Sequence, residues 1–123
     1  MTAEAGKERT YSDDEIKARL ANDLPHWWLE DGHIRRKYHT HGWKGTLMVI
    51  NTIGHLAEAA WHHPDIAASY GWVEVRLQNH AAKGVTDKDF ELAKKIEEVV
   101  LWQPGKAGGA LEGTPQNDQR FAY

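Results

Sequence analysis

Residues 43–64 read WKGTLMVINTIGHLAEAAWHHP, and apolar side chains recur through this segment at spacings of three and four. This period predicts an amphipathic helix from about Trp43 to His63. A helix that is apolar over most of its circumference needs cover on more than one side. In a chain of 123 residues, the second cover is expected to come from a partner subunit. The two apolar rows are Trp43, Leu47, Ile50, Gly54, Ala57 and Trp61, and beside them Val49, Ile53, Leu56 and Ala60.

Two adjacent imidazoles stand at the end of this helix. Pro64 disfavours helical geometry at the residue before it, so the helix is predicted to end at His63. Glu58 and His62 are four residues apart and share a helix face, whereas His63 projects about 100° around the axis. The helix dipole favours protonated imidazoles there by roughly 0.3–1 kcal/mol when they are exposed. A purely structural alternative is that both histidines bond the last carbonyls of the helix.

The segments on either side of the central helix predict hairpins. Asp31-Gly32 lies between two extended runs, which is typical of a two-residue hairpin turn. Residues 65–80 contain the second hairpin, in which Val73, Val75 and Leu77 alternate with polar residues. His80 ends that strand and, by alternation, points away from the core side.

Capping signals predict a helix at each end of the domain. Ser12-x-x-Glu15 has the spacing of a capping box, and the helix is expected to run to about Asn22. Thr86 begins the last helix, which Pro104 ends. Asp89, three residues after Thr86, suits a capping role by itself. The order helix, hairpin, helix, hairpin, helix indicates an α+β domain over residues 12–102, with a loose leader at 1–11 and an extended arm at 103–123.

The composition excludes several classes of protein. There is no cysteine, so disulfides and thiolate metal sites are absent. The net charge of −3 gives no broad basic field, and no apolar run reaches the roughly 20 residues of a membrane helix. We therefore expect a cytoplasmic protein without nucleic acid or membrane partners. His39 and His41 could share a strand face as metal ligands, but no compact ligand motif such as His-Glu-x-x-His appears, so no metal is predicted.

One constellation is more specific than its parts. Glu58-x-x-x-His62-His63-Pro64, followed by Tyr70, His80 and Asp89, resembles the signature of the pterin-4a-carbinolamine dehydratases. DLPHWWLEDG at 23–32, in which Trp27 matches the family tryptophan, and AAKGVTDKDFELAKKIE at 81–97 extend the resemblance over about residues 12–102. It implies three helices packed on one face of a four-stranded antiparallel sheet, in the order α-β-β-α-β-β-α. It also implies a homodimer or homotetramer.

The resemblance implies removal of water from a 4a-hydroxytetrahydropterin, with no metal or other cofactor. An acid must protonate the departing hydroxyl and a base must take the ring-nitrogen proton, and imidazoles suit both roles. His62, His63 and His80 would be catalytic, with Glu58 and Asp89 at the substrate site. The remaining expected substrate-binding residues are Trp27, Gln78 and Asn79; the last two replace hydroxyl-bearing residues of the family. Trp61 and the YHTHGW segment at 38–43 also depart from the family pattern.

The tail, QPGKAGGALEGTPQNDQRFAY at 103–123, resembles that of dehydratase-like proteins encoded with α-carboxysomes. That resemblance implies a Rubisco assembly factor or chaperone for carbon fixation, with the Rubisco large subunit as partner and an association with carboxysomes. The apolar residues Leu111, Phe121 and Tyr123 could dock on a neighbouring subunit or a client, and the alternative is a disordered end. We predict the assembly function, and an active 4a-hydroxytetrahydropterin dehydratase, a lyase, is the alternative.

Overall fold

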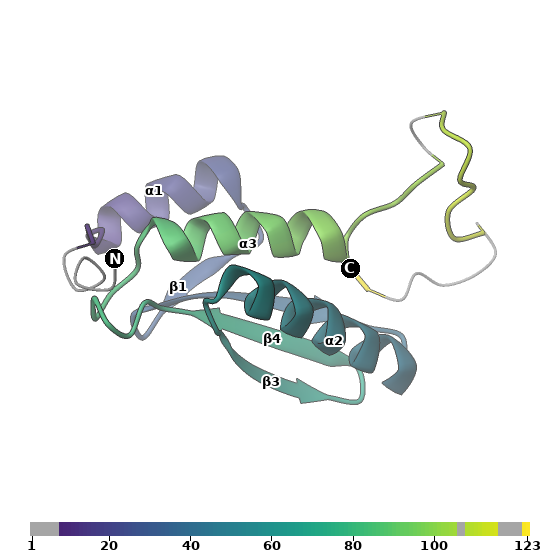
Figure 1. The fold of residues 1–123 in the computed structure, drawn as a ribbon, viewed down its shortest axis with the longest axis horizontal. Coiled ribbons are helices and arrows are strands. Elements are labelled where there is room, and N and C mark those ends of the chain that lie inside the picture. Colours follow the sequence, from purple (N-terminus) through teal and green to yellow (C-terminus); the bar gives the residue numbers. More distant parts are fainter. Residues whose placement is uncertain (1–7, 106–107, 116–121) are drawn as a thin grey trace.

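Three helices and a four-stranded antiparallel sheet make up the fold in the computed structural model, which describes residues 8–105, 108–115 and 122–123 (Figure 1). The sheet order is β1-β2-β4-β3, so the two central strands come from different hairpins. The predicted α+β class and element order are confirmed. The elements are α1 (Asp13–Asp23), β1 (Trp28–Glu30), β2 (His33–His39), α2 (Trp43–Ala60), β3 (Asp65–Ser69), β4 (Trp72–Leu77) and α3 (Asp87–Val100).

The sheet has one buried and one open face, as the alternation in β4 predicts. Ile34 pairs with Leu77 and Tyr38 pairs with Val73 across the central strands, and all four side chains are fully buried. The residues between them, such as Lys37 and its partner Glu74, are only partly buried. The helices therefore cover a single face of the sheet, where α2 contacts β3 and β4 while α1 contacts β1.

Local signals place the first helix and the first hairpin where the sequence predicts them. The hydroxyl of Ser12 accepts a hydrogen bond from the Glu15 backbone N–H, and the Glu15 carboxylate accepts one from the Ser12 N–H. Asp31 and Gly32 both have positive φ, at 51° and 73°, as a tight turn between β1 and β2 requires. These short-range interactions fix the boundaries of α1 and of the hairpin.

The prediction that α2 ends at His63 is wrong, because the helix ends at Ala60. Trp61 adopts the left-handed conformation (φ 53°, ψ 46°), and its backbone N–H bonds the Glu58 carbonyl. The N–H of His62 then bonds the Ala57 carbonyl at 3.1 Å, which completes a Schellman motif. Glycine is the usual residue at the left-handed position, and a bulky side chain there costs about 1–2 kcal/mol. His62 and His63 consequently lie in the turn beyond the helix.

One long face of α2 stays open in the described structure. Val49, Ile53 and Ala57 are buried against the sheet and α3. Trp43, at the start of the predicted apolar row, is 52% exposed, and Leu47 and Met48 are exposed as well. The second cover that the sequence predicts is therefore not supplied by the described residues of this chain.

Two residues of the segments expected to be loose, Tyr11 and Tyr123, lie against the domain. Tyr11, at the end of the expected leader, places its ring edge-on to Phe90 and donates its hydroxyl to Asp87. At the end of the arm, Tyr123 exchanges two backbone hydrogen bonds with His39, along the part of the β2 edge that the short β1 leaves unpaired. The remaining predicted docking residues are Leu111, which is exposed, and Phe121, which lies outside the described residues.

A cluster of polar groups joins α3 to β2 within the core. One carboxylate oxygen of Glu97 accepts hydrogen bonds from Trp27 Nε1 at 3.2 Å, Arg36 Nε at 3.0 Å and the Tyr38 hydroxyl at 2.6 Å. Tyr38 is fully buried, and the Arg36 side chain is 9% exposed. Burial, followed by the hydrogen bond to Glu97, raises the pKa of Tyr38 far above its ordinary value of 10.0.

The raised pKa makes stability depend on pH in the alkaline range. Tyr38 stays protonated in the folded chain but ionises near pH 10 once unfolded, so its contribution is complete below about pH 10 and is lost at higher pH. Relative to Tyr38→Phe, the unmutated protein is expected to lose up to about 1.4 kcal/mol of unfolding free energy per pH unit above pH 10. Urea unfolding between pH 8 and 11 measures this, and parallel curves for the two proteins would contradict it.

Candidate functional site

The buried carboxylate of Asp89 holds the imidazole of His62. Asp89 lies in the first turn of α3 and is fully buried. Its Oδ1 is 2.6 Å from His62 Nε2, and its Oδ2 accepts the backbone N–H of Thr86 at 2.9 Å. Asp89 thus performs the capping role and also positions a histidine. Because Oδ1 is an acceptor, His62 carries its proton on Nε2 and leaves Nδ1 for proton exchange.

A second imidazole–carboxylate pair lies closer to solvent. His63 Nε2 is 2.9 Å from Glu58 Oε1, and both side chains are more than half exposed, at 53% and 69%. An ion pair this exposed contributes little to stability and weakens with salt. The ring of Trp61 contacts His63 edge-on, with 5.0 Å between ring centroids. The two adjacent histidines are therefore held by different carboxylates.

His80 lies on a separate loop that is tied to the same helix cap. β4 ends at Leu77, so the prediction that His80 ends this strand is wrong; the His80 side chain is exposed, and its ring lies 6.4 Å from that of His33. The preceding residue, Asn79, donates its side-chain amide to the Thr86 hydroxyl at 3.3 Å. Thr86 is in turn bonded to Asp89, so hydrogen bonds connect this loop to the partner of His62. Among the described residues, no hydrogen bond joins His80 directly to His62 or His63.

Three predicted substrate-binding residues make hydrogen bonds within the chain. Gln78 donates its amide to the Gly32 carbonyl at 2.9 Å. Asn79 is 5% exposed, and its side-chain oxygen accepts the Ala82 N–H. Trp27 is also buried and bonds Glu97, eight residues along α3 from Asp89, which corresponds to roughly 12 Å. The structure therefore brings Glu58, His62, His63 and Asp89 together. The hydrogen bonds of Gln78, Asn79 and Trp27 hold parts of the fold to one another.

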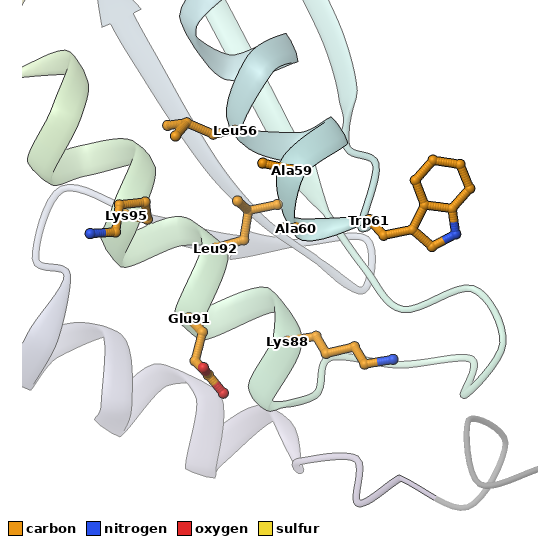
Figure 2. Close-up of a pocket in the computed structure, with 8 residues that line it drawn as sticks. All are labelled: Leu56, Ala59, Ala60, Trp61, Lys88, Glu91, Leu92 and Lys95. Carbon is orange, nitrogen blue, oxygen red and sulfur yellow. The ribbon is translucent and has the colours of Figure 1, made fainter. Parts of the chain in front are cut away.

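A hollow of about 570 Å³ lies between α2 and α3, and Trp61, the residue before His62, is among the residues that line it (Figure 2). Leu56, Ala59 and Ala60 line it from α2, and Leu92 faces them from α3. The residues on the α3 side of this hollow are not among the predicted site residues. The sequence signal that could have identified them is the three- and four-residue spacing of Lys88, Glu91, Leu92 and Lys95.

The described residues 8–105, 108–115 and 122–123 contain no group of three histidine or acidic side chains able to hold a metal ion. His39 and His41, the candidate pair of strand ligands, both lie against the ring of Tyr123. In that same part of the chain, no helix is long and apolar enough to cross a membrane.

The shared role of Asp89 can be tested by a single isosteric change. Asp89→Asn retains an oxygen for the Thr86 N–H but presents an amide donor to His62, so the imidazole loses its carboxylate and its fixed tautomer. We expect a loss of unfolding free energy of about 1–2 kcal/mol, because a hydrogen bond to a charged group is lost. Any acid–base activity should fall, by at most the roughly 10²–10⁴-fold that a positioned acid–base group contributes, because the imidazole is no longer held in place. A folded variant with unchanged activity would contradict the positioning role.

Comparison with known proteins agrees with the fold and the motif. The family model described as Pterin 4 alpha carbinolamine dehydratase matches residues 9–99. A protein from Aquifex aeolicus (strain VF5), provisionally named a pterin-4-alpha-carbinolamine dehydratase, is 44% identical over 92 residues, which cover 75% of this chain and 92% of the relative. A relative from Chloroflexus aurantiacus (strain J-10-fl) with the same provisional name is 39% identical, covering 72% of this chain and 95% of its own length.

A solved structure is similar in fold. The crystal structure of a transcriptional coactivator/pterin dehydratase from Brucella melitensis superposes with a TM-score of 0.68 at 24% identity. The match covers 75% of this chain and 99% of that one. At this identity, the likeness concerns the arrangement of helices and strands alone.

Proposed function

The chain belongs to the pterin-4a-carbinolamine dehydratase family, and from this premise we propose that it eliminates water from a 4a-hydroxytetrahydropterin. The observation that carries the proposal is the His62–Asp89 pair, in which a buried carboxylate 2.6 Å from Nε2 orients an imidazole at the edge of the domain. Imidazoles exchange protons near neutral pH, as this reaction requires. The curated relatives carry the corresponding provisional name.

The proposed reaction needs one proton donor and one proton acceptor. A protonated imidazole gives its proton to the 4a-hydroxyl, which departs as water when the carbon–oxygen bond breaks. A neutral imidazole takes the proton from the ring nitrogen, whose electrons form the new carbon–nitrogen double bond. His62 and His63 each have Nε2 beside a carboxylate, which leaves Nδ1 of each ring for these transfers. His80, on the loop tied to the cap of α3, is proposed as the third catalytic imidazole.

Turnover by the unmutated protein tests this proposal. The purified chain should convert a freshly formed 4a-hydroxytetrahydropterin to the quinonoid dihydropterin faster than buffer alone, as followed by absorbance. Addition of a metal chelator should leave the rate unchanged, since the proposed chemistry uses only imidazoles. A rate equal to that of the buffer control would remove the proposal.

We also propose that the chain forms a homodimer or homotetramer. The supporting observation is the open face of α2, where Trp43, Leu47 and Met48 are exposed together. Large exposed apolar patches on soluble proteins are typical of interaction surfaces. Light scattering during gel filtration should give a multiple of the 14.0 kDa chain mass, and Leu47→Glu should lower it. A monomer at micromolar concentration would contradict this proposal.

A second candidate function is assistance in Rubisco assembly, as the resemblance of the tail to α-carboxysome proteins suggests. The observation favouring it is the arm itself, which lies beyond the family match at 9–99. In this arm, Leu111 is 58% exposed. An exposed apolar side chain there is available to a client such as the Rubisco large subunit. Co-expression with Rubisco should yield less assembled enzyme when residues 103–123 are removed. An equal yield with and without the arm would count against this function.

A further inference from the structure

Trp61 occupies a backbone position that its own side chain disfavours. Its φ of 53° lies in the left-handed region, where a Schellman motif normally places glycine. Non-glycine residues in such conformations are strained and persist only where the surrounding structure holds them. They cluster at ligand-binding and active sites. Local conformational preference therefore gives no reason for a tryptophan at this position.

Burial within the chain gives no reason either. Trp61 is 74% exposed, more than any other large apolar residue recorded as exposed in the described part of the chain. The contact recorded for its ring is the edge-on approach to His63. A tryptophan presents a large apolar surface that is stabilised when another group covers it. Both observations indicate that Trp61 serves an interaction outside the folded chain itself.

The surroundings of Trp61 indicate the chemistry of that interaction. Figure 2 shows the indole extending past the end of α2 and away from α3, with the Lys88 side chain running in the same direction. Trp61 directly precedes His62 and lies beside the Glu58–His63 pair, in which His63 contacts Glu58 Oε1 and no described residue hydrogen-bonds Oε2. An aromatic face next to a carboxylate oxygen suits a flat heterocycle with N–H groups along one edge.

We propose that Trp61 stacks on the planar ring of the substrate and acts as a binding and specificity residue for this chain. The inference rests on the proposed dehydratase function, since the stacked ring is the pterin. The stacked heterocycle would lie beside His63, with its N–H edge toward Glu58. A stacking contact is made in the bound substrate and in the transition state alike, so it should act on KM rather than on kcat.

Substitution by glycine separates ligand binding from folding. Trp61→Gly relieves the left-handed strain, so Tm should rise by a few degrees. The same change removes the stacking surface, and we expect Kd for the non-reacting analogue 7,8-dihydropterin to rise about tenfold by calorimetry. KM should rise similarly while kcat changes less than about twofold. Trp61→Phe should retain most of the affinity, and Trp102→Ala, which removes a tryptophan that is 63% exposed on another part of the surface, should bind as the unmutated protein does.

The outcomes distinguish a failure of this inference from a failure of the proposed dehydratase function. If the unmutated protein binds no 7,8-dihydropterin and turns over no substrate, the proposed function fails and this inference fails with it. If the unmutated protein binds the analogue and Trp61→Gly binds it equally well, only the role of Trp61 is overturned. Equal binding accompanied by a lower oligomer mass for Trp61→Gly would likewise overturn it, by identifying a subunit contact instead.

Discussion

Replacing His62 by alanine is expected to lower kcat/KM for a 4a-hydroxytetrahydropterin by about 10²–10⁴-fold, the usual contribution of a positioned acid–base group. The change removes the imidazole that Asp89 orients and leaves a buried carboxylate without its partner. Because Asp89 also bonds the Thr86 N–H, the start of α3 should persist and the variant should fold. Stopped-flow absorbance on matched concentrations of folded protein gives the comparison.

The matched control is His41→Ala. His41 is exposed, precedes the start of α2 and contacts the ring of Tyr123, so it lies at the opposite end of α2 from His62. Its variant should retain the activity of the unmutated protein. Equal activity of His62→Ala and His41→Ala would show that the imidazole of His62 takes no part in the reaction.

Replacing Glu97 by alanine should have the largest effect on stability, a loss of about 3–5 kcal/mol of unfolding free energy. The carboxylate is the common acceptor for Trp27, Arg36 and Tyr38, and its removal leaves a guanidinium buried without its charged partner. Total stabilities of domains are about 5–15 kcal/mol, so this loss is a large fraction of the free energy of unfolding. Equilibrium unfolding in urea measures the loss.

Two further variants identify the cause of that loss. Glu98→Ala removes the neighbouring carboxylate, which makes only an exposed 3.5 Å pair with Lys95, and should cost less than about 1 kcal/mol. Arg36→Met introduced into Glu97→Ala removes the unpaired charge and should recover part of the stability. If Glu97→Ala and Glu98→Ala are equally stable, the buried cluster contributes nothing to the fold.

Most of the fold follows from short-range signals in the sequence. The Ser12 capping box and the Asp31-Gly32 turn fix their elements through interactions between residues at most three apart. The alternation through Val73 and Leu77 identifies the buried face of β4, because a strand exposes its two faces in turn. Such patterns depend only on residues that are close together in the sequence, which is why the order of elements could be predicted.

The end of α2 could not be predicted in this way. Pro64 disfavours helical geometry at His63, the residue before it, and the helix was therefore predicted to end at His63. The helix stops earlier because Trp61 adopts a left-handed conformation, which side-chain preference would assign to glycine. Neither side-chain preference nor burial of Trp61, which is 74% exposed, explains this early end, so a single sequence carries no signal for it.

The geometry of the predicted site residues could not be read from the sequence. The spacing of Glu58 and His62 suggested a shared helix face, but Glu58 instead bonds His63, because the chain turns after Ala60. The contact between His62 and Asp89 joins residues 27 apart, and no periodic pattern in the sequence predicts a contact between residues so far apart. For the same reason, the partners of Gln78 and Trp27 became apparent only from the folded chain.

The pairing of β2 with β4 has a consequence for how the chain reaches its native state. Ile34 meets Leu77 and His39 meets Trp72, so the central pair forms only after the chain between them has been drawn into a long loop that contains all of α2. Each hairpin can form within microseconds by itself, whereas closing such a loop raises the entropic barrier. The rate-limiting step of folding should therefore be the meeting of the two hairpins over the central helix, and relaxation should fall in the range typical of mixed α/β topologies.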